Sequence, residues 1–347
     1  MTTDVLSNKS RIEYMDLAKG ICIIMVVLFH VAKFYDDTLL VNRFFKLIRM
    51  PLYFFLSGFF FKSYSGFFDF LKRKTNKLLI PFAFWYLFSV GFCLLMYHVF
   101  GLTLKYETDF EFKNMITAFW VKEDFPNAPI WFLLCLFYVN LLFYCVYLLT
   151  KNKKNNLLMI FILSMLCGGV GILLWRLKIN LPAFLDSAFT SVPFFCFGYL
   201  VKNTKILEQD KYDRHLLLIS AVLIVIIGCI ALITGKGYSL KFNTFSWQSA
   251  LIAYPCGFLG TMAVIFFSKK VNRIPVVSTY GRYSIMILVT HSILIQLYGH
   301  LLNYIGIQDS IALWLNLLIT LLSYLVLIPF MKRFMPHVTA QKDVIKV

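Results

Sequence analysis

Ten apolar runs, each long enough to cross a lipid bilayer, leave this chain few ways to fold. A helix needs about 20 predominantly apolar residues to span the hydrocarbon core. Backbone N–H and C=O groups find no partners in lipid, so a spanning segment of this length folds as a helix. The sequence therefore predicts an all-α, polytopic membrane protein with about ten transmembrane helices. The expected spans run from about Leu17 to Tyr35, Phe44 to Phe61, Leu78 to Phe100, Ile130 to Thr150, Leu157 to Trp175, Phe184 to Val201, Leu216 to Thr234, Trp247 to Ser268, Tyr283 to Ile305 and Ser310 to Met331.

The composition excludes several classes of protein. Hydrophobic residues make up 60% of the 347 residues and charged residues 15%, whereas soluble domains carry about 25% charged residues. An ordinary cytosolic enzyme, a disordered chain and a nucleic-acid-binding domain are therefore excluded. The eight cysteines all fall inside apolar runs, without CxxC pairs or histidine clusters. We expect them to be buried hydrophobes, and we expect no metal site.

The basic residues indicate an orientation. The formal net charge is +17, from 34 Lys and Arg against 17 Asp and Glu. With the N-terminus inside, about two-thirds of the basic residues fall in inside segments, which is the bias typical of cytoplasmic loops. Both termini are therefore expected in the cytoplasm, with the protein in the cell inner (plasma) membrane among membrane lipids. Because the positive charge is dispersed, it predicts no nucleic-acid partner.

The chain shows no internal repeat and no linker long enough to separate domains. We therefore expect a single integral-membrane domain over residues 1–347. Its membrane region covers about 17–331, and short tails precede and follow it.

Three polar side chains share one face of the first span. Lys19 and His30 are eleven residues apart, which at about 100° per residue returns to the same side of a helix, and Asp16 lies close to that side. Ionisable side chains at membrane depth are costly and usually face a bundle interior or an aqueous cavity. One interpretation is a functional stripe, with the acid and the lysine at the cytoplasmic mouth and the imidazole near mid-membrane. The alternative is that Lys19 snorkels and pairs with Asp16, while His30 satisfies a helix–helix hydrogen bond.

A second histidine, His291, lies at a similar depth in the ninth expected span, which opens near Gly281 and Arg282. Two imidazoles at one depth could line one cavity. The alternative is that His291 is a packing residue bonded to a neighbouring helix.

The first inside loop, expected from Lys62 to Lys77, ends in a basic cluster that contains Arg73, Lys74 and Lys77. Such a cluster could hold the phosphates of a cytoplasmic ligand such as coenzyme A. The alternative is that it retains the loop inside and binds lipid headgroups.

Two other segments place small or aromatic residues in spans. Ser57 and Gly58 lie in the middle of the span that begins near Pro51. A pair of small residues lets another helix backbone approach closely. The pair could belong to a functional site, or it could serve only helix packing. Ser57 has no nearby base in the sequence, so it is not assigned as a nucleophile. Trp131 begins the fourth span, either at a site or as an interfacial anchor.

Taken in order, these segments resemble the acyltransferase-3 family of multi-pass membrane acyltransferases, which includes bacterial O-acetyltransferases that modify cell-surface polysaccharides. Five matches cover nearly the whole membrane region. They are Arg11…Asp16…Lys19-Gly20 with a basic-residue-x10-His spacing to His30; Pro51…Phe54-Phe55-Leu56-Ser57-Gly58-Phe59; Lys74 and Lys77 before Pro81; Trp131-Phe132-Leu133; and Gly281-Arg282-Tyr283-Ser284…His291.

The resemblance implies an acyl-CoA donor, most simply acetyl-CoA, that enters from the cytoplasm as a co-substrate, with no permanently bound cofactor. It implies a hydroxyl acceptor on a cell-surface or lipid-linked glycan. His30 matches the family's essential histidine and Lys19 its partner basic residue, so His30, Lys19 and Asp16 are the expected catalytic residues. Neutral His30 can act as a general base or as a transient acyl carrier, and the sequence does not choose between them.

The remaining expected site residues are assigned by the same resemblance. Acyl-CoA is expected to contact Arg11, Arg73, Lys74 and Lys77, and substrate is expected to contact Ser57, Trp131, Arg282 and His291. The family more often has Arg-x-x-Arg where this chain has Lys74 and Lys77, so phosphate recognition here would use point charges rather than bidentate forks.

A transporter or exporter of polysaccharide or small molecules, without covalent chemistry, is the rival hypothesis. Ten spans with polar residues inside the membrane also suit a translocation path. The absence of a visible inverted repeat and the Lys19–His30 spacing favour an O-acyltransferase.

Overall fold

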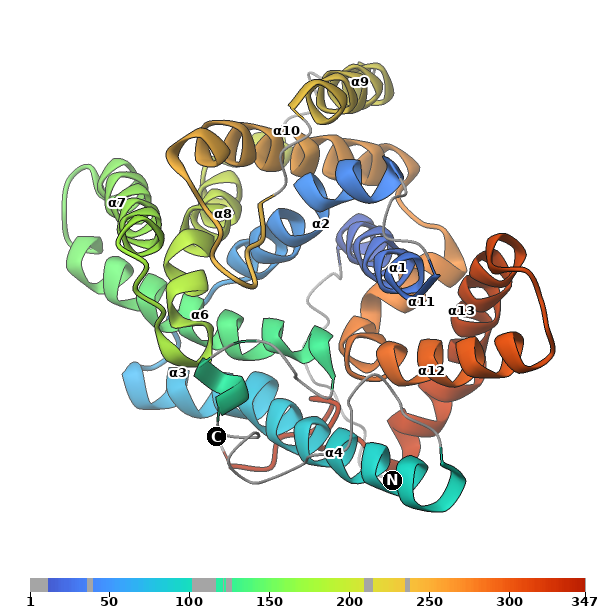
Figure 1. The fold of residues 1–347 in the computed structure, drawn as a ribbon. Helices are drawn as coiled ribbons and strands as arrows, with labels where there is room; N and C mark the ends of the chain where they lie inside the picture. The colour runs from blue at the N-terminus through green and yellow to red at the C-terminus, as the bar shows by residue number, and fades with distance from the viewer. Residues whose placement is uncertain are drawn as a thin grey trace, which may run out of the picture.

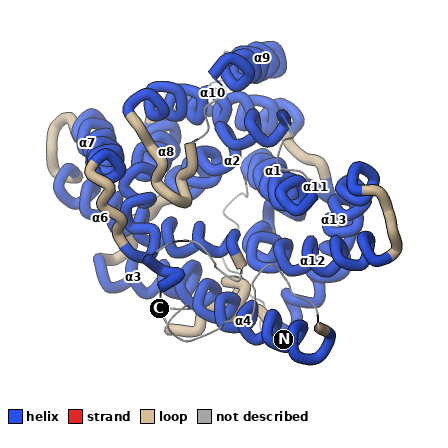
Figure 2. Tube along the Cα trace, in the orientation of Figure 1, coloured by secondary structure: helices blue, strands red, loops and turns tan. Residues whose placement is uncertain are grey.

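The computed structural model describes residues 12–35, 40–101, 117–120, 122, 127–208, 215–234 and 238–346. Helices dominate this part of the chain, which contains an isolated β-bridge between Ser239 and Thr244 but no strand (Figure 2). The helices are α1 (Glu13–Tyr35), α2 (Leu40–Phe59), α3 (Phe67–Lys74), α4 (Ile80–Phe100), α6 (Trp131–Thr150), α7 (Asn156–Arg176), α8 (Leu185–Asn203), α9 (Leu216–Thr234), α10 (Trp247–Val271), α11 (Pro275–Arg282), α12 (Ser284–Tyr304) and α13 (Asp309–Phe334).

Each of the ten expected spans is a helix. Nine helical segments in the described part of the chain are long and apolar enough to cross a membrane, which confirms an all-α polytopic membrane protein. The remaining one, α2, is less apolar because its first half carries Arg43, Lys46 and Arg49.

The least apolar of the long helices, α2, lies in the interior of the bundle. Figure 1 shows α1 and α2 in the middle, with α7 and α9 at the periphery. The peripheral helices expose large apolar side chains such as Leu166 on α7 and Ile233 on α9. Apolar surface faces outward, as expected in lipid, whereas Lys46 and Arg49 of α2 line an internal pocket.

Two glycines allow α2 and α8 to pack at backbone contact. A Cβ atom on Gly58 of α2 would collide with the carbonyl oxygen of Phe195 on α8, and one on Gly198 of α8 would collide with that of Phe55 on α2. Small residues are the usual means by which membrane helices approach closely. The Ser57-Gly58 pair therefore has a packing role through its glycine.

The basic cluster expected in a loop is helical, which corrects the sequence prediction. α3 begins at Phe67 and continues through a π-helical turn, Thr75–Leu79, into α4. Pro81 lacks an N–H, and its ring would clash with the carbonyl group of Lys77 in a regular α-helix. The wider π turn relieves this clash, so the helix continues without a loop.

Replacing Gly58 with alanine should destabilise the protein, because the added Cβ has no space between α2 and α8. We expect a cost of about 1–3 kcal/mol, measured as a lower thermal unfolding midpoint in detergent. The matched control is Gly91→Ala on α4, where a Cβ meets open space. An unchanged midpoint for Gly58→Ala would contradict the close packing described above.

Candidate functional site

An inner pocket of about 550 Å³ lies at the end of the bundle where α1 begins. Four basic side chains line it: Lys19 on α1, Lys74 and Lys77 at the α3–α4 junction, and Arg282 at the end of α11. No acidic side chain is among the described residues of this lining. A cavity with this charge is suited to a ligand with several negative charges.

Backbone contact between α1 and α11 brings two distant sequence segments to the inner pocket. Gly281 on α11 lies against the carbonyl oxygen of Asp16, and Gly20 on α1 lies against that of Val277. Lys19, next to Gly20, has its ammonium 4.4 Å from the ring centroid of Phe60.

The C-terminal tail (336–346) binds beside the inner pocket. The Asn76 amide donates to the carbonyl oxygen of Ile345 at 2.8 Å, and its oxygen accepts the N–H groups of Val344 and Ile345. The Lys77 ammonium donates to the carbonyl oxygen of Ala340 at 2.8 Å and lies 3.1 Å from the Asp343 carboxylate. Lys77 therefore belongs both to the pocket and to the tail contact. The tail and the start of α1 lie at the same end of the bundle.

An outer pocket of about 490 Å³ lies toward the opposite end. It is lined by His30 and Lys33 on α1, Lys46 and Arg49 on α2, and Lys241 between α9 and α10. Four basic side chains thus line this pocket as well, and no acidic side chain is among its described lining residues.

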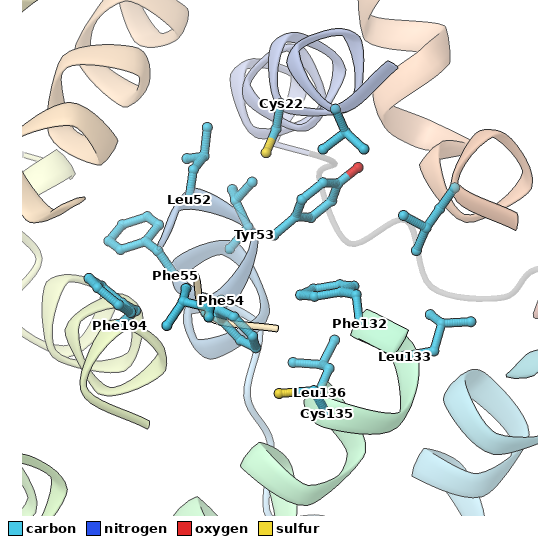
Figure 3. Packing of buried hydrophobic residues seen from close by; sticks show 14 of the residues in the cluster. Cys22, Leu52, Tyr53, Phe54, Phe55, Phe132, Leu133, Cys135, Leu136 and Phe194 are labelled. Atoms are coloured by element: carbon cyan, nitrogen blue, oxygen red, sulfur yellow. The ribbon is translucent and has the colours of Figure 1, made fainter. Parts of the chain in front are cut away.

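Three side chains, Tyr53, Phe132 and Leu288, line both pockets, and we call them the septum. The ring centroids of Tyr53 and Phe132 are 5.2 Å apart, and Figure 3 shows these residues extending from α2 and α6 into the interior. The inner and outer pockets therefore lie back to back, with these shared side chains between them.

The two mid-membrane histidines are in contact. The ring centroids of His30 and His291 are 5.1 Å apart. His291 is fully buried, and its Nδ1 lies 2.7 Å from the carbonyl oxygen of Ile287. A carbonyl oxygen can only accept, so Nδ1 carries the proton and Nε2 is the unprotonated nitrogen in the neutral ring. That Nε2 has no hydrogen-bond partner among the described residues.

An inward loop (238–246) between α9 and α10 forms one wall of the outer pocket. The Ser187 hydroxyl donates to the carbonyl oxygen of Lys241 at 2.9 Å, and the Asn243 amide donates to that of Gly171 at 2.9 Å. Tyr238 is buried in this loop, and burial raises the pKa of its hydroxyl. The hydroxyl therefore remains a hydrogen-bond donor at neutral pH.

Arg49 is a buried cation in the wall of the outer pocket. Its side chain is 7% exposed, and its guanidinium carbon lies 3.5 Å from the ring centroid of Phe29. Neither its Nη1 nor the Tyr238 hydroxyl has a hydrogen-bond partner within the described part of the chain. A buried charge with an unsatisfied N–H is energetically costly, so this position requires an explanation.

The residues expected from the sequence divide between the two pockets. Lys19, Lys74, Lys77, Arg282 and Ser57 line the inner pocket, whereas His30 and Trp131 line the outer one. The Ser57 hydroxyl donates to the Tyr53 carbonyl oxygen at 2.9 Å.

Four expected residues remain. His291 contacts the ring of His30 but lines neither pocket. Arg73 is directed to Asp69, at 2.9 Å, and to the ring of Tyr64, at 4.8 Å, and it does not line the inner pocket. Asp16 does not line the inner pocket, but its backbone carbonyl group packs against Gly281, which does. Arg11 lies outside the described residues.

Sequence reasoning missed the basic lining of the outer pocket. One signal was present: Lys33, Lys46 and Arg49 flank the expected outer end of the first two spans, against the positive-inside tendency. Tyr238 and Lys241 carry no such local signal, because only the folding of the inward loop brings them to α2.

A bundle of membrane-spanning helices with two pockets lined by basic side chains is the architecture of an integral-membrane protein that binds charged ligands. Comparison with family models gives a more specific result, because the model of an acyltransferase domain matches residues 12–331. The chain therefore belongs to the acyltransferase-3 family and is a multi-pass membrane acyltransferase. No curated protein and no solved structure matches it significantly.

Replacing Asn76 with alanine should release the tail from the inner pocket, since one side chain makes three hydrogen bonds to it. Hydrogen–deuterium exchange at Val344 and Ile345 should accelerate by about ten-fold or more, while exchange in α1 stays unchanged. Asn203→Ala is the control, because Asn203 bonds within its own helix. Unaltered exchange in the tail would show that Asn76 does not hold it.

Proposed function

We propose that this acyltransferase moves an acyl group, most simply acetyl, from acyl-CoA in the inner pocket to a hydroxyl of a cell-surface or lipid-linked glycan in the outer pocket, in the plasma membrane. The observation that carries the proposal is the pair of basic pockets that share the septum, with Lys19 on one side and His30 on the other. In such an arrangement only the acyl group needs to pass between the pockets.

The chemistry of the donor suits the inner pocket. Acyl-CoA carries its phosphates on a nucleotide and its thioester at the end of a long, narrow arm. Lys74 and Lys77 offer point charges at the cytoplasmic mouth, and Lys19 and Arg282 extend the positive lining inward. A bound nucleotide at the mouth would direct the arm toward Tyr53 and Phe132. Acyl-CoA would be a co-substrate, with nothing bound permanently.

His30 is suited to the chemical step. As a general base, the neutral imidazole would take the proton of the acceptor hydroxyl while that oxygen attacks the thioester carbonyl carbon. A C–O bond forms, the C–S bond breaks, and the coenzyme A thiolate leaves and takes up a proton. As an acyl carrier, an unprotonated imidazole nitrogen of His30 would attack the thioester carbonyl carbon and expel the coenzyme A thiolate. The acceptor hydroxyl would then attack the acyl-imidazole, which releases the imidazole of His30, and the hydroxyl proton would pass to the thiolate or to water. In both routes His291, held by its bond to Ile287, would position the ring of His30.

The family assignment favours acyl transfer over a transporter without covalent chemistry. The assay that tests the proposal uses purified protein, labelled acetyl-CoA and candidate glycans. Transfer of label to a glycan hydroxyl is the expected result. If the protein neither hydrolyses acetyl-CoA nor transfers its label, but moves a glycan across liposomes, the transporter is the correct description.

His30→Ala should lower the rate of acyl transfer by about 10²–10⁴-fold, the usual contribution of a positioned general base, or abolish it if His30 carries the acyl group. Folding and membrane insertion should be retained, checked by gel filtration and thermal unfolding. His98→Ala is the matched control, because His98 is exposed on α4 and outside both pockets. A His30→Ala protein with near-normal transfer would remove His30 from the site.

Replacing both Lys74 and Lys77 with alanine should raise KM for acetyl-CoA by at least about ten-fold, because two charge-assisted contacts to phosphate are lost. The value of kcat should change less, since these side chains would contact the phosphates and not the reacting carbonyl carbon. The control is Lys62→Ala with Lys72→Ala, two exposed lysines that do not line the inner pocket. An unchanged KM in the Lys74/Lys77 variant would show that these lysines do not bind acetyl-CoA and serve only to orient the protein in the membrane.

A further inference from the structure

The outer pocket is positively charged, and transfer of an acyl group to a neutral sugar would not require that charge. Lys33, Lys46, Arg49 and Lys241 surround the cavity that also contains His30. Lys33 and Lys46 lie toward the outer ends of α1 and α2, where the positive-inside tendency disfavours them, and Arg49 lies midway along α2. A concentration of positive charge that opposes the topology signal indicates a role in the site.

Arg49 distinguishes this pocket from a surface that attracts lipid headgroups. Lipid phosphates are reached by exposed, flexible side chains, whereas Arg49 is 7% exposed and is directed into the protein. Stacking on Phe29 fixes the plane of the guanidinium, and its Nη1 is buried without a hydrogen-bond partner among the described residues. The Tyr238 hydroxyl is a second buried donor without a hydrogen-bond partner among the described residues. Two unsatisfied donors beside one cavity are arranged to receive an acceptor group from a ligand.

We propose that the outer pocket selects an anionic acceptor: a glycan that carries a carboxylate or a phosphate near the hydroxyl to be acylated, with Arg49 as the principal partner of that anion. The proposal rests on the function proposed above and adds the chemical class of the acceptor. A planar guanidinium binds an oxyanion through two parallel N–H donors. The Tyr238 hydroxyl would donate a further hydrogen bond.

The placement of His30 gives the anion a role in orientation. Arg49 on α2 and His30 on α1 line the same pocket, and the septum residue Tyr53 lies one helical turn beyond Arg49. An acceptor held through its anion at Arg49 would present neighbouring hydroxyl groups to His30 and to the septum. Lys33, Lys46 and Lys241 would raise the local concentration of anionic glycans around this contact.

The inward loop, which carries Tyr238 and Lys241, is fixed by hydrogen bonds to two helices. The inward loop is anchored to α8 through Ser187 and to α7 through Asn243. Tyr238 and Lys241 are therefore held in place before any ligand binds, which lowers the entropy cost of binding.

Binding, rather than turnover, is the direct test. The protein in nanodiscs is titrated with matched probes: methyl glucuronide against methyl glucoside, and N-acetylglucosamine 1-phosphate against N-acetylglucosamine. The expected result is binding of at least one charged probe about ten-fold or more tighter than its neutral partner. The pair that shows the difference distinguishes a carboxylate from a phosphate. Equal affinities within both pairs would overturn the proposal.

Variants assign the preference to the outer pocket. Arg49→Gln should reduce the charged-to-neutral affinity ratio toward one, whereas Arg43→Gln should preserve it, because Arg43 is an exposed arginine on the same helix and outside the pocket. A ratio that persists in Arg49→Gln but disappears in the Lys74→Ala, Lys77→Ala protein would place the anion site in the inner pocket and overturn the proposal. If Arg49→Gln does not fold, Lys241→Gln on the inward loop is used, and an unchanged ratio there counts against the proposal.

Acyl transfer is measured separately, so that the two claims fail in different ways. A protein that prefers the charged probes through Arg49 but does not consume acetyl-CoA retains the anion site and loses the proposed reaction. A protein that acylates neutral and charged glycans with equal KM retains the reaction and loses the anion site.

Discussion

The cost of placing charge in a membrane determines the arrangement of this protein. Ionisable side chains inside a bilayer are tolerated only where water, a ligand or an opposite charge stabilises them. Here α2, the least apolar of the long helices, lies in the middle, and α7 and α9 lie at the periphery (Figure 1). Basic side chains gather in two cavities, with four in each. The apolar surface outside and the charged interior are consequences of the same constraint.

Close helix packing connects these cavities. Gly20 and Gly281 bring α1 against α11, and Gly58 with Gly198 brings α2 against α8. Tyr53 of α2, Phe132 of α6 and Leu288 of α12 form the septum that both pockets share. In the proposed reaction a small acyl group moves between the pockets past these side chains, while the proposed coenzyme and glycan remain on their own sides. The division suits group transfer better than passage of an intact glycan.

Much of the fold was predictable because bilayer thickness leaves a clear signature in the sequence. All ten expected spans are helices, and Lys74 and Lys77, which the sequence places in one basic cluster, line the same pocket. The helical basic cluster was missed because a π turn before Pro81 is a local accommodation that apolar periodicity does not reveal. The pairing of Arg49 with Tyr238 at one cavity depends on an inward loop fixed by contacts to α7 and α8. Such long-range placement has no local signal.

The central claim is that donor and acceptor react from opposite faces of the membrane, and sided proteoliposomes test it most directly. Protein is reconstituted in one orientation, with labelled acetyl-CoA supplied at the face of the inner pocket and a membrane-impermeant anionic glycan enclosed at the other. Labelled glycan is expected in this arrangement, and none is expected when donor and acceptor are both at the face of the outer pocket. Transfer only when both are supplied at one face would contradict it.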